Sequence, residues 1–239
     1  FRKQVFTNFR KKDFKDYQVK VIIYLREQSL FLQSLWSQYV KSGLTTDDFH
    51  IFINQILLSE DDVVRYFGAY DLLLKPWINV FEKRHVHPIP FVLGTFRKNA
   101  FLTFLAHCNV PNTEQFQTPE NQNISPGFKT LEIIRLINQD IVSVKKRNII
   151  GHYVRRIAKE NQWDKQKLNL LDLELYERIQ SRFTSANQYL SENFCDGRPF
   201  FGTKFEEKTL SSFDKRSMSR AEWEKIARSM VIFFAEEYM

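Results

Sequence analysis

Arg147, Asn148 and His152 are the residues of this chain whose types and spacing are best suited to chemistry. A histidine with an ordinary pKa of about 6.5 can act as a base or as an acid near neutral pH. An arginine offers a planar, permanently charged fork for the non-bridging oxygens of a phosphate. Together they could cleave RNA without a metal, with the ribose 2′-hydroxyl as the nucleophile and a cyclic phosphate as the product. Asn148 could hold the pair or a phosphate through its amide.

The residues around this trio are mostly basic, which suits a polyanion. We expect Lys146, Tyr153 and Arg155 to contact RNA, two of them through charge and one through its ring. A second basic cluster lies near the N-terminus, and the whole chain carries a net charge of +7. Such charge favours a nucleic-acid partner, but a solvated basic surface explains it equally well.

The string Arg147-Asn148-x-x-x-His152 resembles the signature of the HEPN superfamily, in which an Arg and a polar residue, usually Asn, precede a His. The resemblance covers residues 131–159 and the helical architecture in general. HEPN domains are helical bundles that commonly dimerise, and active members are metal-independent ribonucleases that include toxins and antiviral defence proteins. The resemblance therefore implies a homodimeric endoribonuclease in a toxin or phage-defence role, with RNA as substrate and no cofactor. It also implies an antitoxin or another regulatory partner.

On this interpretation His152 is the acid/base, Arg147 the phosphate and transition-state group, and Asn148 the supporting hydrogen-bonding group. Five helical positions turn through about 500°, so Arg147 and His152 lie about 140° apart around an ideal helix. Either the helix distorts near Gly151, or two copies of the chain assemble the site across a dimer. We favour the dimer, because Gly151 continues an apolar stripe and would permit a close approach at a twofold axis.

A non-catalytic helical module that binds a nucleotide, RNA or a protein partner is the alternative function. Other candidate residues have simpler explanations. His85 and His87 have the spacing of a metal pair, but no acidic or cysteine ligand is near them in sequence, so we expect no metal. His107-Cys108 could supply a thiol nucleophile, but it ends an apolar helix and is more simply part of the core. His50 lies on an amphipathic helix and is expected to be structural.

Helical periodicity recurs along the chain and predicts an all-α, HEPN-like bundle of about six to eight helices in a single domain over residues 1–239. We expect one helix over residues 19–42, a loop over 85–90, a long loop over 110–130 and no pair of strands. A basic segment over residues 1–18 precedes them, and a motif-bearing helix pair over 131–193 follows, with its first helix unbroken from 131 to about 161. A capping box, Ser219-Arg-Ala-Glu222, predicts the start of the last helix.

The composition predicts a soluble, cytoplasmic protein with a large core. The chain has 239 residues and 23 Phe, which can fill a thick core with few side chains. Its two cysteines, Cys108 and Cys195, fit a reducing compartment, where each is expected to be a small buried group. No apolar run approaches the roughly 20 residues that span a bilayer.

Overall fold

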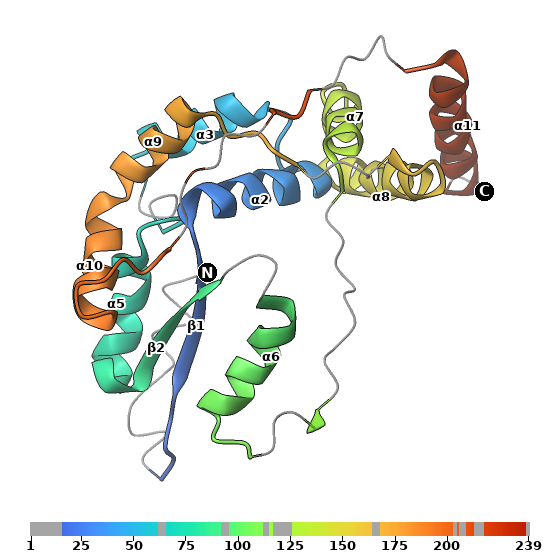
Figure 1. The fold of residues 1–239 in the computed structure, drawn as a ribbon. Helices are drawn as coiled ribbons and strands as arrows, with labels where there is room; N and C mark the ends of the chain where they lie inside the picture. Colours follow the sequence, from blue (N-terminus) through green and yellow to red (C-terminus); the bar gives the residue numbers. More distant parts are fainter. Residues whose placement is uncertain are drawn as a thin grey trace. The chain divides into compact units, whose positions relative to one another are not determined.

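The structure is a computed structural model that describes residues 16–61, 66–91, 96–111, 115–116, 126–163, 168–202, 205, 209–212 and 218–237. These residues form nine α-helices and one pair of strands (Figure 1), which confirms the mostly helical class. Residues 1–15 of the expected basic segment and most of the expected 110–130 loop lie outside the described residues. Within the described part of the chain, no helix combines the length and the apolar character needed to cross a membrane.

The chain divides into two compact units. The first takes the described residues of Phe1–Phe31, Ser59–Asn123 and Glu177–Lys204. The second takes those of Leu32–Leu58, Ile124–Tyr176 and Phe205–Met239. Each unit is built from segments that are far apart in sequence.

A pair of parallel strands lies in the first unit. β1 (Val21–Arg26) pairs with β2 (Val86–Phe91) in a register that runs from Val21 opposite Val86 to Arg26 opposite Phe91. The predictions of a helix from residue 19 and of a loop over 85–90 are therefore wrong, as is the prediction of no strand pair. The run Val-Ile-Ile-Tyr-Leu is β-branched and aromatic, and over six residues its spacing does not distinguish a strand from a helix. The two prolines of β2 are tolerated because each strand of a two-stranded sheet is an edge.

The core of the first unit covers one face of this strand pair. Leu25 and Val86 are buried there, together with Tyr70 and Leu74 of α5 (Tyr70–Phe81) and Leu190 of α10 (Thr184–Phe194). A short 3-10 helix, η2 (Lys83–His85), connects α5 to β2. α6 (Phe96–His107) follows β2, and in Figure 1 it lies beside the strands.

The second unit is helical. Its described elements include most of α2 (Gln28–Lys41), α3 (Phe49–Leu58), α7 (Phe128–Asn138), α8 (Val144–Glu160) and α11 (Arg220–Glu237), while α9 (Leu173–Arg182) begins in this unit. The fully buried Trp36 contacts the rings of Phe49 and Phe128. The prediction of one unbroken helix from 131 to 161 is wrong, because the chain turns at 139–143 and forms two helices there. Ser143 caps the second of them, α8, by accepting a hydrogen bond from the Lys146 amide at 3.4 Å. The range 131–193, expected to hold a helix pair, holds α7, α8, α9 and α10.

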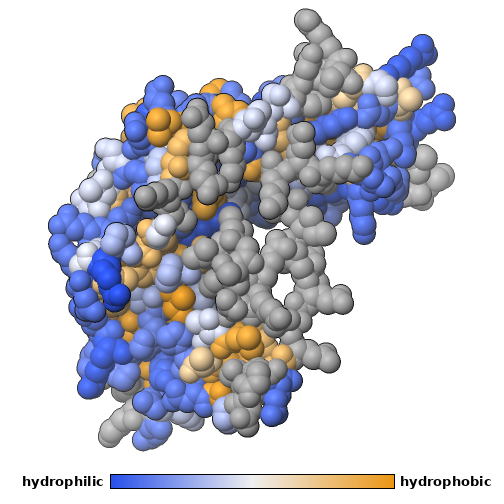
Figure 2. Space-filling view, in the orientation of Figure 1, coloured by the Kyte–Doolittle hydropathy of each residue, from blue (hydrophilic) through white to orange (hydrophobic). Residues whose placement is uncertain are grey.

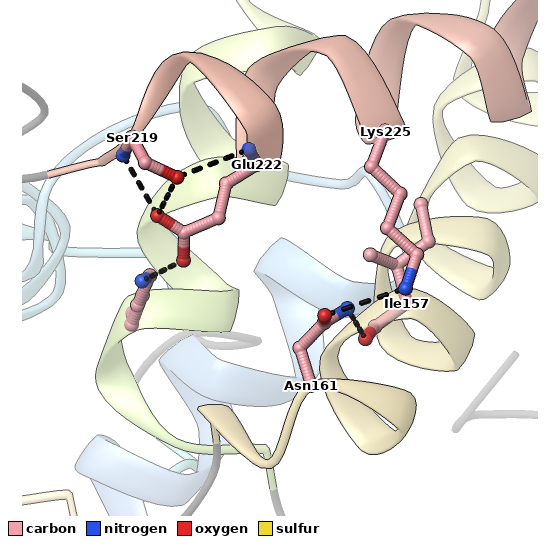
Figure 3. A network of polar contacts seen from close by, with 6 residues as sticks. Ile157, Asn161, Ser219, Glu222 and Lys225 are labelled. Carbon is pink, nitrogen blue, oxygen red and sulfur yellow. Dashed lines mark hydrogen bonds and ion pairs between the residues drawn. The ribbon is translucent and has the colours of Figure 1, made fainter.

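The predicted capping box is confirmed at the start of α11 (Figure 3). The Ser219 amide donates to the Glu222 carboxylate at 2.8 Å, and the Glu222 amide donates to the Ser219 hydroxyl at 3.2 Å. The same carboxylate forms an ion pair with Lys129 of α7 at 2.7 Å. Lys225 reaches the Asn161 side chain at the end of α8 at 3.3 Å. These contacts fix α11 against α7 and α8.

We expect the substitution Gly151→Ala to destabilise the protein. A Cβ atom at this buried position of α8 would lie 2.8 Å from the Lys41 carbonyl oxygen, which is main chain and cannot turn away. The gain in helix propensity is then outweighed by an overpacking cost of about 1–3 kcal/mol in the free energy of unfolding, measured by denaturant titration. Gly202→Ala is the matched control, because a Cβ atom there meets nothing within 4 Å. Equal stability of the two variants would contradict the packing described here.

Candidate functional site

α8 carries the residues that were predicted from the sequence to form the site, and it is strongly amphipathic. Its inner face is buried in the second unit through Ile150, Gly151, Val154, Ile157 and Ala158. Its outer face is exposed and almost wholly polar, and hydrophilic residues cover the α8 region in Figure 2. One exposed stripe along this face, with positions three or four residues apart, consists of Lys145, Asn148, His152, Arg156 and Lys159.

Arg147 does not lie on this stripe. Its Nε donates to the Ile141 carbonyl and its Nη1 to the Gly43 carbonyl at 3.4 Å. Gly43 has a φ of 68°, and a Cβ atom there would lie 2.3 Å from the Arg147 Cβ. The half-buried Arg147 therefore joins the turn after α2 to the turn before α8, where it stabilises the second unit.

Arg147 and His152 are not brought together within one chain. α8 is continuous through Gly151, so the predicted alternative of a helix distorted at that residue is wrong. The close backbone approach that Gly151 permits is to Lys41 of the same chain, which takes the place that we expected a symmetry copy to take. A site assembled from two copies stays a prediction.

His152 lies among cations. The pKa of its exposed imidazole is lowered from 6.5, first by partial burial and then by the charge of Arg155. The half-buried Arg155 donates from Nε to the Gly151 carbonyl at 3.1 Å, and burial also lowers its pKa. Burial lowers the pKa of Lys41 as well, and Arg155 lowers it further. A neutral imidazole beside the positive charge of Arg155 is suited to accept a proton next to an anionic ligand.

The remaining residues predicted to contact RNA have separate environments. Asn148 and Lys146 are exposed, and Tyr153 is half-buried with the Arg156 guanidinium 4.9 Å from the centre of its ring. Asn148 and His152 thus share the exposed stripe, while Arg155 and Tyr153 border it. The sequence-predicted set is therefore divided, with Arg147 apart from the others.

Arg26, the last residue of β1, is a functional candidate that was not predicted from the sequence. Its side chain lies on the same side of the strand pair as that of its register partner Phe91, with Cζ 6.0 Å from the ring centre. Its Nε is buried and has no hydrogen-bond partner among the described residues. Its pKa is lowered by burial, against the opposing influence of Glu27 and Tyr70. The sequence gives no clear signal for this position, because the run Val-Ile-Ile-Tyr-Leu before Arg26 fits a strand or a helix over so short a length.

Glu27 is adjacent to Arg26, but its carboxylate is used elsewhere. It accepts hydrogen bonds from the main-chain amides of Ser29 and Leu30, each at 3.1 Å, and from the Gln180 side chain. It therefore caps the first turn of α2, where main-chain amides lack partners within the helix. The neighbouring Gln28 donates to Asn187 at 2.7 Å and to the Gly68 carbonyl at 3.2 Å, which leaves its Oε1 buried without a partner in the described chain.

The weaker candidates are placed as follows. His85 and His87 lie in η2 and β2, and no cluster of three or more His, Cys, Asp or Glu side chains that could hold a metal occurs among the described residues. Cys108 is exposed and Cys195 is half-buried, so the expectation that both are buried is wrong. His50 is exposed on α3.

Comparison of the chain with protein-family models, curated proteins and solved structures finds no match.

We expect His152 to titrate below 6.5 in the folded protein, because partial burial and Arg155 both favour its neutral form. Removing the charge with Arg155→Gln raises the pKa of His152 toward 6.5 without restoring it fully, since the effect of burial remains. Proton NMR of the imidazole across pH measures both values. Arg156→Gln is the control, and we expect no comparable rise. An ordinary or elevated pKa in the wild type would contradict this electrostatic account.

Proposed function

We propose that this protein binds a small ligand with a phosphate or sulfate group, and that Arg26 supplies the positive charge for that group. The observation that carries the proposal is the buried Nε of Arg26, which has no partner in the described structure. A buried charged group is costly unless it is paired and hydrogen-bonded. The Arg26 side chain is half-buried and Glu27 already acts on its charge, so what is missing is an acceptor for Nε. An oxyanion would supply that acceptor, and a planar guanidinium fits such an oxyanion well.

The position of Arg26 supports the same proposal. Arg26 and Phe91 are the last residues of the two parallel strands, so they lie at the same end of the sheet, the carboxyl end. In open α/β sheets, ligands bind just outside the carboxyl ends of parallel strands. Because Glu27 already caps the amides of Ser29 and Leu30, the N-terminus of α2 has less to offer an anion than Arg26 has. The buried Oε1 of Gln28, two residues on, could accept a hydrogen bond from a hydroxyl or amine of the same ligand.

We expect inorganic pyrophosphate to stabilise the wild-type protein and not the Arg26→Met variant. A ligand that binds only the folded state raises the free energy of unfolding by about 2.7 kcal/mol at a concentration one hundred times its dissociation constant. Thermal unfolding with increasing pyrophosphate, phosphate or sulfate at constant ionic strength measures this effect and ranks the three anions. Arg198→Gln, which alters an exposed arginine of the same unit, should respond as the wild type does.

Without ligand, we expect Arg26→Met to be at least as stable as the wild type, since the variant removes the buried Nε donor that has no acceptor. Higher stability combined with lost binding would distinguish a ligand-binding residue from a structural one. Equal stabilisation of the wild type and Arg26→Met by all three anions would refute the proposal.

A second candidate is the HEPN-like endoribonuclease, which we also propose on a specific observation. His152 lies exposed in the middle of the basic stripe of α8, within reach of a bound polyanion. In this proposal His152 is the acid/base and Asn148 its support, while Lys146, Tyr153 and Arg155 contact RNA. Arg147 could take the phosphate only by leaving the carbonyls of Ile141 and Gly43, so Arg155 is the better-placed cation. A homodimer with a toxin or antiviral role belongs to the same proposal.

For this candidate we expect wild-type protein to cleave total RNA in the presence of a chelator and to leave cyclic-phosphate ends. His152→Ala should abolish cleavage, whereas His50→Ala, which alters an exposed histidine of α3, should not. RNA binding without cleavage by all three proteins would favour the non-catalytic module. Cleavage at equal rates by all three would point to a contaminating nuclease and sink the assignment of His152.

A further inference from the structure

A pair of imidazoles lies in the first unit, outside both candidate sites. His87 of β2 and His107, the last residue of α6, have ring centres 5.5 Å apart with the ring planes at 40°. Neither side chain is fully buried. The two rings form a direct side-chain contact between α6 and the strand pair.

The surroundings of this pair are positively charged. Lys20, just before β1, donates from Nζ to the His107 carbonyl at 2.9 Å and to the Asn109 side chain at 3.3 Å. The groups that influence the charge of His87 are His107 from α6, Lys20 from the segment before β1 and His85 from η2. All three are cations or become cations at low pH, so each opposes a positive charge on His87.

α6 buries little of the side-chain surface that the structure describes. From Ala100 to His107, the part of the helix whose side chains are described, no residue is fully buried, and Phe104 is 44% exposed. Besides the histidine contact and Lys20, a hydrogen bond of 2.9 Å from the Tyr24 hydroxyl to the Ala100 carbonyl joins α6 to β1. Elements with so little buried surface open locally at low free-energy cost.

We propose that the His87–His107 pair makes the docking of α6 onto the strand pair depend on pH, firm at neutral pH and weakened by acid. When the imidazoles take up protons, two adjacent cations face each other beside Lys20 and His85, and the repulsion is relieved if α6 moves away. This inference is independent of ligand binding at Arg26 and of RNA cleavage at His152.

Proton linkage determines whether the docking of α6 becomes stronger or weaker as the pH falls. Burial, His107, Lys20 and His85 together lower the pKa of His87 from 6.5 in the docked state. Undocking removes His107 and part of the burial, while Lys20 and His85 stay near His87, so the undocked state binds the proton more tightly. The stability of docking is therefore fully present above the pKa of the undocked state, falls as the pH drops below that value, and levels off below the pKa of the docked state.

Hydrogen exchange of the α6 amides at pH 7.5 and pH 5.5, each corrected for its intrinsic rate, tests the proposal. We expect the protection of α6 to fall several-fold at the lower pH, while the amides of α10 in the same unit keep theirs. His107→Gln retains the main-chain carbonyl that Lys20 binds but cannot become a cation, so its α6 should lose much less protection. His50→Gln is the control and should behave as the wild type does.

If a variant folds poorly, the wild type alone still shows whether the protection of α6 depends on pH. Unchanged α6 protection between the two pH values would overturn the proposal. A fall of the same size in His107→Gln and in the wild type would overturn the assignment to this pair. An equal loss of protection in α10 would indicate general acid unfolding and would likewise contradict a local effect.

Discussion

Arg26 sets the constraint on which the proposed function depends, because a guanidinium nitrogen removed from water has no partner in the described part of the chain. Few buried polar atoms in proteins lack a partner, and a bound ligand is one way in which the missing acceptor is supplied. The neighbouring carboxylate of Glu27 does not fill this role, since it binds the first amides of α2 and the Gln180 side chain. A buried donor that the described chain leaves without an acceptor is more informative about function than a larger number of charges in solvent.

The cations of α8, in the second unit, differ from Arg26 in that most of them are exposed or already hydrogen-bonded. α8 carries more positive charge than the end of β1, but Arg147 donates to two main-chain carbonyls, and Lys145, Arg156 and Lys159 are exposed. Exposed cations of this kind cost nothing to leave alone, so they demand no ligand. Arg155 differs from these cations, because its charge lowers the pKa of both His152 and Lys41, and an anion bound beside it would relieve this repulsion.

The sequence predicted the elements with long helical patterns and missed those that depend on distant partners. The Ser219–Glu222 capping box marked the start of α11 because all of its contacts are local. β1 could not be recognised in the same way, since a strand of six residues exists only through pairing with β2, sixty-five positions further on. The 140° separation of Arg147 and His152 was predictable from helix geometry, whereas the attachment of Arg147 to Gly43 was not, because it depends on how α2 and α8 pack. Arg26 was missed together with its strand.

The most direct test of the central claim is the NMR signal of the Arg26 Nε–H group, assigned by its loss in an Arg26 variant and followed during titration with inorganic pyrophosphate at constant ionic strength. This group is the donor that we consider unsatisfied. We predict a saturable shift of its resonance, with exposed arginines such as Arg198 unchanged. A resonance of Arg26 that does not move, or that moves only in parallel with those of the exposed arginines, would contradict the account.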